Sequence, residues 1–170
     1  MRRWLVFIVL LLATAPVLRA AQKDDRQLGG QAADAVRTYA HYSIFDDITI
    51  SVMDGTVTLN GRVTSPQKRN DIGARVAKID GVRSVVNDIA VLPDSPLDAS
   101  IRTRIASAIY NHPSFWRYAS MANPPIHIIV EHARVTLTGN VGTEVDRRLA
   151  YSLALVDGTL GVTNELKIDR

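Results

Sequence analysis

Apolar and polar residues alternate along two neighbouring segments of the chain, Ile48–Met53 and Thr56–Val63. An apolar side chain at every second position is typical of a β-strand with one buried face and one face in solvent. Asp54 and Gly55 separate the segments, and such a pair favours a two-residue hairpin turn. The pattern therefore predicts an antiparallel hairpin.

The same pattern occurs a second time. Val57 and Val135 hold the same place in it and are 78 positions apart, whereas matching residues near the end of each copy are 77 positions apart. One residue is therefore lost in the second copy, and we place the loss between Val141 and Leu149. A repeat of this length predicts two homologous modules, here called module 1 and module 2.

The strands of module 2 differ from those of module 1 at the turn. His132 and Ala133 replace the Asp-Gly pair, so we expect a turn of a different type or one under strain. A third strand is expected at the end of each module, at Ser84–Leu92 and Gly161–Ile168, where apolar residues again alternate.

Helical periodicity precedes and follows each hairpin. The expected first helices span Ala32–Tyr42 and Leu97–Tyr110, and the second helices begin at the N-cap residues Ser65 and Thr143. Each second helix is expected to bury one apolar face and to end at a glycine in the left-handed C-cap conformation. The residues expected there are Gly81 and Gly158 as caps, and Ile72, Val76, Ile79, Leu149, Leu153 and Val156 on the buried faces.

The order helix–strand–strand–helix–strand, found twice, predicts an α+β fold of two tandem αββαβ modules, each a three-stranded sheet with two helices on one face. We expect module 1 at residues 28–93 and module 2 at residues 97–169, with Pro93 and Pro96 stiffening the linker. Because modules of this size have small cores, the two are expected to pack on each other or on a partner.

Matched glycines and asparagines are expected to maintain the fold. Gly61 and Gly139 lie at inward positions of a strand, where a side chain would collide with the packed helix. Asn87 and Asn164 are in phase with buried apolar residues, so their amides are expected to satisfy nearby backbone groups. The full set with an expected structural role is Gly55, Gly61, Gly81, Asn87, Gly139, Gly158 and Asn164.

The first 20 residues have the composition of an export signal. Arg2 and Arg3 precede the apolar run Trp4–Leu12, and small residues follow up to Ala20. The apolar stretch is shorter than the roughly 20 residues that span a membrane. We therefore expect a signal peptide at residues 1–20, cleaved near Ala20, and a mature protein that is peripheral rather than transmembrane.

Cleavage changes the charge of the protein. The chain has 20 basic and 17 acidic residues, and Arg2, Arg3 and Arg19 lie in the signal, so the mature chain has as many acidic as basic residues. A nucleic-acid-binding function, which the sequence pI of about 9.4 would favour, is therefore not expected. The absence of cysteine excludes disulfides, thiolate metal sites and a lipid-modified cysteine.

A set of short motifs recurs in the same order in both modules. The motifs are Asp54-Gly55, Val57-x-Leu59-x-Gly61-x-Val63, Asp80-Gly81-Val82-x-x-Val85-x-Asn87-x-Ile89, Val135-x-Leu137-x-Gly139-x-Val141 and Asp157-Gly158-x-x-x-Val162-x-Asn164-x-Leu166. With these motifs the two modules resemble the BON domain, a module of bacterial envelope proteins. The resemblance implies the αββαβ fold, a periplasmic location, phospholipid binding, support of outer-membrane integrity and a role under osmotic stress.

Module 2 has a longer segment than module 1 between its first helix and first strand, at Asn111–Pro125. Its aromatic residues and arginine suit a lipid headgroup region, and equally a protein-interaction hot spot. The alternative is that the aromatic residues fold back onto a small core. The candidate binding residues in this segment are Phe115, Trp116, Arg117, Tyr118 and Met121.

The second helix of module 2 carries a further apolar strip on the side away from its expected core residues. Tyr151 and Leu155 lie on this side, with Arg147 and Arg148 nearby. We interpret the strip as a surface for a membrane or a partner. The alternative is that it packs against the other module.

No catalytic motif occurs in the sequence, and the four histidines lack partners at metal-ligand spacing. We expect a non-enzymatic binding protein without a cofactor or metal. The favoured hypothesis is association with anionic phospholipid at a membrane surface, strengthened by the tandem arrangement, in support of envelope integrity or stress tolerance. The alternative is a protein–protein interaction or chaperone-like module that acts on envelope proteins.

Overall fold

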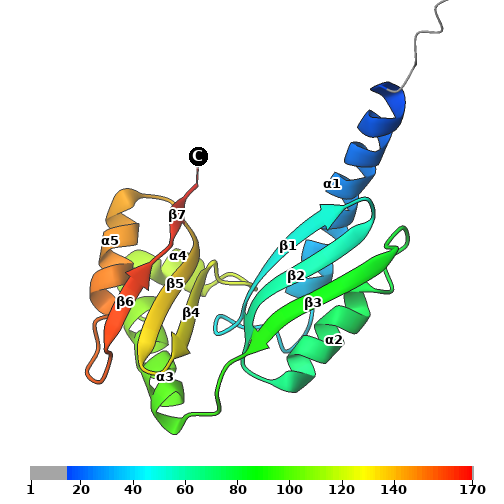
Figure 1. Cartoon of the computed structure of the whole chain (residues 1–170). Coiled ribbons are helices and arrows are strands. Elements are labelled where there is room, and N and C mark those ends of the chain that lie inside the picture. Colours follow the sequence, from blue (N-terminus) through cyan, green and yellow to red (C-terminus); the bar gives the residue numbers. More distant parts are fainter. Residues whose placement is uncertain (1–14, 170) are drawn as a thin grey trace, which may run out of the picture.

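The alternating segments form two sheets, one in each of two modules joined by a short linker (Figure 1). This computed structural model describes the backbone of residues 15–169 and the side chains of residues 24–169. The predicted α+β fold of two tandem αββαβ modules is confirmed. Residues 1–14 of the expected signal peptide lie outside the described residues.

In module 1, β1 (Asp47–Met53) pairs antiparallel with β2 (Thr56–Val63), and β3 (Ser84–Val91) lies parallel to β2. Helices α1 (Ala15–Arg37) and α2 (Pro66–Val76) contact this sheet, and Figure 1 shows both on the same face. The side chains between helices and sheet form the core, whose fully buried members include Ala32, Val57, Leu59, Val63, Ile72 and Val76.

Module 2 repeats this arrangement with α3 (Pro96–Tyr110) and α5 (Glu144–Leu153) as its two main helices. The remaining elements are η1 (Pro113–Phe115), α4 (Trp116–Ala119), β4 (Ile126–Glu131), β5 (Arg134–Val141), β6 (Gly161–Asn164) and β7 (Lys167–Ile168). The third strand of this module is interrupted: β6 and β7 both pair with β5, but the two residues between them do not.

The first helix differs from the prediction. Instead of spanning Ala32–Tyr42, α1 begins well before this range and ends at Arg37. It runs through Gly29 and Gly30 although glycine disfavours helix, because the packing of its inward face on the sheet outweighs local propensity. The expected cleavage position near Ala20 falls within α1.

Both hairpin turns have the same conformation. The φ angles are 50° and 74° at Asp54 and Gly55, and 52° and 59° at His132 and Ala133. The turn of module 2 is therefore not of a different type. It carries strain instead, because two non-glycine residues adopt the left-handed region.

Two glycines are required for a reason other than the expected one. Gly61 and Gly139 have φ angles of 133° and 101°. A Cβ atom there would collide with the carbonyl oxygen of Asp47 or Pro125, at the start of the neighbouring strand, and not with a helix. These glycines allow two backbones to approach closely.

Asn87 and Asn164 join the third strand to the second helix in the same way in both modules. The Nδ2 of Asn87 donates to the carbonyl oxygen of Arg69 at 2.9 Å, and that of Asn164 to Arg147 at 2.8 Å. Each Oδ1 accepts from the backbone N–H two residues further on. Both amides thus satisfy backbone groups.

The second helices end earlier than predicted. Gly81 and Gly158 have left-handed φ angles of 90° and 88°, but the C-cap residues are Ala77 and Ala154, in right-handed conformation. The glycines therefore turn the loop that follows each helix. They do not cap it.

The buried positions of α2 and α5 show where module 2 lost one residue relative to module 1. The fully buried Ile72 and Val76 of α2 correspond to the fully buried Ala150 and Ala154 of α5, and each pair is 78 positions apart. The placement of the loss in Val141–Leu149 was therefore wrong. The residue is lost after the helix, in the loop leading to the last strand.

The loop before β1 docks onto module 2. The carbonyl oxygen of Ile44 accepts from the N–H of Ile128 in β4 at 2.7 Å, and Ile44 and Phe45 pack against the core of module 2. Arg62 and Glu131 form an ion pair at 3.2 Å across the same junction. The two modules thus pack on each other, as expected from their small cores.

Candidate functional site

The inserted segment of module 2 folds into η1 and α4, which bring two of its aromatic residues inward. Phe115 is fully buried and Tyr118 is 5% exposed, and both belong to the core of module 2. Their assignment as binding residues is therefore corrected, because neither side chain can reach a partner. Folding back onto a small core explains these two positions.

Trp116, Arg117 and Met121 remain at the surface. The side chains of Trp116 and Met121 are exposed by 62% and 48%, and that of Arg117 by 54%. The indole Nε1 of Trp116 donates to the carbonyl oxygen of Asn111 at 3.3 Å, which orients the exposed ring. The loop thus presents an amphipathic aromatic side chain beside a cation.

Polar contacts hold α4 beside the first turn of α5. Arg117 forms an ion pair with Asp146 and stacks over the ring of Tyr118, with its Cζ 4.5 Å from the ring centroid. The hydroxyl of Tyr118 accepts from the N–H of Gly142 at 2.7 Å. These contacts could not be predicted from the sequence, since the residues that make them are far apart along the chain. They bring the two predicted candidate regions together.

Exposed apolar side chains lie on the outer side of α5 and on the residue that follows its C-cap Ala154. Val145, Tyr151 and Leu155 are exposed by 72%, 38% and 56%. Sequence reasoning included Tyr151 and Leu155 but missed Val145, although the N-cap Thr143 places it in the first turn, on the side of Arg148. Ala150, on the opposite side, is fully buried.

Both arginines of α5 bind one carboxylate. Glu144 accepts from Arg147 at 2.7 Å and from Arg148 at 2.9 Å, and these hydrogen bonds lower the pKa of its carboxyl to about 2. Two cations thus share one anion, which leaves the group with a net positive charge. Arg148 is 79% exposed and the more accessible of the two.

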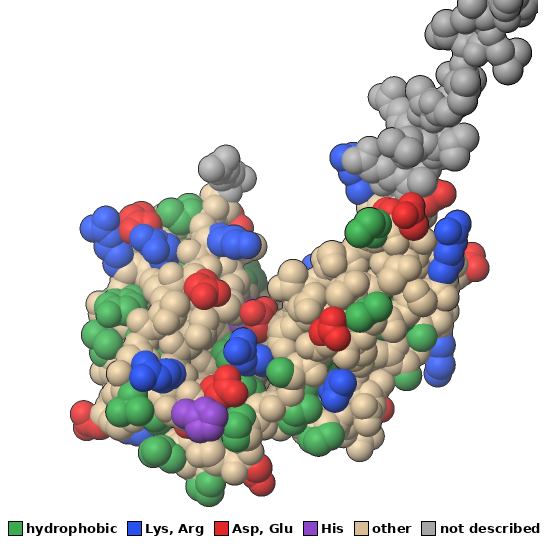
Figure 2. All heavy atoms as spheres, viewed as in Figure 1, with side chains coloured by type: hydrophobic (Ala, Val, Ile, Leu, Met, Phe, Trp, Pro, Cys, Tyr) green, Lys and Arg blue, Asp and Glu red, His purple; other side chains and the backbone are tan. Residues whose placement is uncertain are grey.

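The apolar side of α5 faces solvent. Figure 2 shows hydrophobic and basic side chains gathered at the edge of module 2 where Figure 1 places α5. The module junction lies instead at β4 and the loop before β1. Packing against the other module, the alternative for Tyr151 and Leu155, is therefore wrong.

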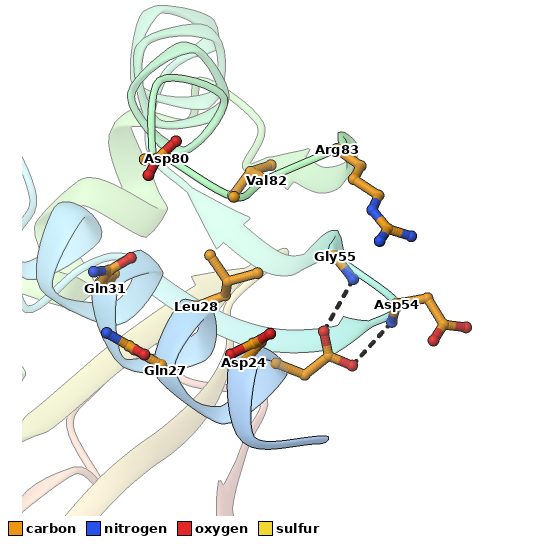
Figure 3. Close-up of a pocket in the computed structure, with 11 residues that line it drawn as sticks. Asp24, Gln27, Leu28, Gln31, Asp54, Gly55, Asp80, Val82 and Arg83 are labelled. Carbon is orange, nitrogen blue, oxygen red and sulfur yellow. Dashed lines mark hydrogen bonds between the residues drawn. The ribbon is translucent and has the colours of Figure 1, made fainter. Parts of the chain in front are cut away.

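A separate pocket of about 580 Å³ lies at the hairpin end of module 1 (Figure 3). Asp24, Asp54 and Asp80 line it, and the carboxylate of Asp25 accepts from the N–H groups of Asp54 and Gly55, both at 2.9 Å. Among the described residues, no group of histidine and acidic side chains could hold a metal ion. Asp25 stabilises the hairpin.

Module 2 stabilises its hairpin in the same way. Asp98 of α3 accepts from the N–H of His132 at 3.0 Å and from that of Ala133 at 2.8 Å. Asp98 is 1% exposed, and both its oxygens are used. A carboxylate from the first helix therefore fixes the turn in each module, a role that sequence reasoning missed.

No helix in the described part of the chain is both long and apolar enough to cross a membrane.

No curated protein matches the chain. Two solved structures that are similar to it belong to CdsD, a structural protein of the type III secretion system of Chlamydia trachomatis. One, its C-terminal domain, has 11% identity, a TM-score of 0.32 and coverage of 81% of this chain and 96% of that chain. The other has 12% identity, a TM-score of 0.31 and coverage of 85% and 94%.

The family model described as the BON domain matches residues 26–93 and 97–170. These two matches correspond to module 1 and module 2 and cover far more than half of the chain. Proteins with this domain are associated with the cell envelope, and the domain is in general a binding module rather than an enzyme. The chain belongs to the BON domain family and carries two tandem copies of the domain.

Proposed function

We propose that module 2 binds the surface of anionic phospholipid membranes from the periplasmic side, through a surface formed by α4 and α5. The observation that carries this proposal is the uneven distribution of exposed large hydrophobic side chains. Among the described residues, only Met53 and Val86 of module 1 belong to this class, whereas module 2 has Leu97, Trp116, Met121, Val145, Tyr151, Leu155, Leu160 and Ile168. We call Trp116, Met121, Val145, Arg148, Tyr151 and Leu155 the α4–α5 surface.

The chemistry of this surface suits the boundary between headgroups and acyl chains. Trp116 and Tyr151 have an apolar ring with one polar group, which favours the interface. Burial of one apolar side chain such as Leu155 contributes up to about 1.5–3 kcal/mol when complete. Several partly inserted side chains therefore suffice for reversible peripheral binding without a membrane-spanning segment.

The arginines add a preference for anionic lipid. Exposed ion pairs such as Arg148–Glu144 contribute only about 0–1 kcal/mol, so a lipid phosphate can take the place of the carboxylate as a partner. A basic residue near an anionic membrane contributes about 1 kcal/mol. Because Glu144 offsets only one of two arginines, the attraction to an anionic surface remains and is screened by salt.

The surface of module 1 supports a division of roles between the modules. Tyr151 in α5 and Leu155 just after it correspond to Gly73 and Ala77, and Val145 to Gln67, at the offset of 78 that the buried residues define. Membrane contact is therefore assigned to module 2, rather than to two equivalent modules. Such binding would support envelope integrity and tolerance of osmotic stress.

Fluorescence of Trp116 tests the proposal. A Trp4→Phe chain leaves Trp116 as the only tryptophan, and we expect its emission to shift to the blue with anionic vesicles, less so in high salt, and little with zwitterionic vesicles. Combined Val145→Ser and Leu155→Ser substitutions should weaken co-sedimentation with the vesicles. Met53→Ser, at a side chain 73% exposed in module 1, is the matched control.

Two results would contradict this function. One is an unchanged emission of Trp116 in vesicles that retain the protein, since Trp116 would then not be in contact with lipid. The other is equal loss of vesicle binding in the Met53→Ser control and in the α5 variant. Binding of envelope proteins that is lost in Trp116→Ala while vesicle binding is kept would favour the protein-interaction hypothesis instead.

A further inference from the structure

The outer strands β1 and β4 are equivalent in position, but their free edges are covered differently. Each strand lies at the edge of its sheet. Ile50 pairs with Leu59, and Ile128 pairs with Leu137, so the two hairpins have the same register at an offset of 78. The free edge of a sheet presents unpaired N–H and C=O groups, which can pair with another chain.

In module 2, partners cover the free edge of β4. The N–H of Ile128 donates to the carbonyl oxygen of Ile44, so the backbone N–H and C=O of Ile128 point away from β5. Alternate residues of an antiparallel strand point the same way, and side chains of α3 cover the outward carbonyl groups on either side. These contacts are Tyr110 Oη to the carbonyl oxygen of Ile126 at 2.5 Å, and Arg102 to that of Val130 at 2.8 Å.

The helix beside β1 lacks the residue that covers this end of β4. Asp25 and Asp98 hold equivalent hairpins, which aligns α1 with α3 at an offset of 73. At this offset Arg102 corresponds to Gly29. A Cβ at Gly29 would lie 3.7 Å from Cγ2 of Val52, the counterpart of Val130. Module 1 therefore has no side chain at the position from which Arg102 covers the edge in module 2.

Two outward residues of β1 consequently have free backbone groups. Ile50 and Val52 are the counterparts of Ile128 and Val130, and none of the described residues gives either of them a hydrogen bond on the outer side. Tyr42 and Ile48 line the same pocket at the start of β1, and burial raises the pKa of Tyr42. The open part of the edge therefore comprises Ile50 and Val52.

A groove of about 430 Å³ runs along this edge between the two modules, where Figure 2 shows the surface to be hollowed. It continues the module junction, because Ile44 and His127 also line it. Its walls are mixed, with the polar residues Arg37, Asp47, Asn123 and Asn140 beside apolar ones. The apolar lining residues outside the junction are Ala33 and Val36 from α1, Ile48 and Ile50 from β1, and Ala122, Pro124 and Pro125 from module 2.

We infer that β1 binds an extended segment of another protein, which adds a strand to the sheet of module 1 and places an apolar side chain in this groove. Free backbone donors and acceptors on a strand are satisfied best by another backbone. The protein contains its own precedent, because the loop around Ile44 occupies the equivalent edge of β4 and packs an apolar side chain beside it. In a second copy this loop is already engaged, so the occupant is a different protein. The groove shares no residue with the α4–α5 surface, and the inference does not depend on lipid binding.

The protein offers a closely matched pair of variants as a test. Gly29→Arg copies the arginine of module 2 and should cover the edge at Val52. Gly30→Arg adds the same charge one position further along α1, where an added Cβ has nothing within 4 Å. Neither glycine has a left-handed φ, and arginine is a better helix former than glycine, so both variants should fold.

The full-length chain and both variants are applied to an array of synthetic heptapeptides. The array contains a peptide with the sequence of residues 41–47 of this chain, because Ile44 in this segment occupies the edge of β4. It also contains every single substitution of that peptide at the position of Ile44. We expect peptides with a large apolar residue there to bind the wild type, binding to fall about tenfold or more in Gly29→Arg, and Gly30→Arg to resemble the wild type. Hydrogen exchange at the Ile50 amide should slow when such a peptide is bound.

Three results would overturn the inference. The first is an array on which no peptide binds the wild type, and the second is equal binding by wild type and Gly29→Arg. The third is wild-type self-association, measured by sedimentation, that Gly29→Arg abolishes, because the occupant would then be a second copy. Thermal unfolding of Gly29→Arg distinguishes a covered edge from a damaged fold, since a covered edge leaves the midpoint no lower than that of the wild type.

Discussion

Asp46 and Lys68 form an ion pair inside module 1, with 2.6 Å between Oδ2 and Nζ. Asp46 is fully buried, and the side chain of Lys68 is 14% exposed. The carboxylate also accepts from the backbone N–H and the hydroxyl of both Ser43 and Thr64. It therefore fixes the loop that presents Ile44 to module 2.

We expect Asp46→Ala to destabilise the protein by about 3–5 kcal/mol. The substitution leaves the largely buried Lys68 charge unpaired and four further donors without an acceptor. Urea unfolding measures the loss. Asp34→Ala is the control, because both side chains of the Asp34–Arg37 ion pair are exposed. This substitution should change the free energy of unfolding by about 0–1 kcal/mol. Equal effects of the two substitutions would contradict this prediction.

Adjacent residues in the inserted segment should respond differently to truncation. Phe115→Ala removes a fully buried ring and should cost about 3–5 kcal/mol of unfolding free energy. Trp116→Ala removes an exposed ring and should stay within about 0.5 kcal/mol, while lowering affinity for anionic vesicles. Chemical denaturation and vesicle co-sedimentation separate the two effects. A large stability loss in Trp116→Ala would show that its ring serves the core.

The hairpin turns should respond in opposite directions. His132→Gly relieves a left-handed φ of 52° at a non-glycine residue and should stabilise the protein by up to about 1 kcal/mol. Gly55→Ala introduces the same strain at a φ of 74° and brings a Cβ to 3.1 Å from Cγ of Arg83, so it should destabilise by about 1–2 kcal/mol. Thermal unfolding measures both, and a destabilised His132→Gly would contradict the strain.

The repeated fold could be predicted from sequence because its signals are local. Alternation along the hairpins and the N-caps Ser65 and Thr143 depend on residues close together in the chain, and the structure has the strands and both caps at these places. The start of α1 could not be predicted, since Gly29 and Gly30 oppose helix locally and only packing on the sheet overrides them.

The candidate site was harder to predict because it depends on long-range contacts. The composition of the inserted segment does not distinguish Phe115 from Trp116, and only the fold turns the first ring inward and the second outward. The Arg117–Asp146 pair, which brings α4 to α5, joins residues 29 positions apart. The free edge of β1 became evident only by comparison with β4 in three dimensions.

The Glu144 carboxyl should remain ionised far into the acid range. Hydrogen bonds from Arg147, and next from Arg148, lower its pKa from 4.5 to about 2. A carboxyl with a lowered pKa contributes stability that is present above its unfolded pKa and lost as the pH falls through the folded pKa. The net charge of the arginine group on α5 should therefore be constant from pH 7 to pH 4, and so should its attraction to a strongly acidic lipid headgroup.

Carboxyl-detected NMR titration of the full chain measures this pKa directly. Arg147→Gln should raise the pKa of Glu144 towards 4.5, and Arg148→Gln should raise it less, because Arg147 makes the larger contribution. Arg104→Gln, in α3, removes one cation without removing a partner of Glu144 and should leave the titration unchanged. If Glu144 titrates near 4.5 in the wild type, both arginines are free in solution, and the net charge that the membrane-binding proposal assigns to α5 would fall with rising pH between 4 and 5.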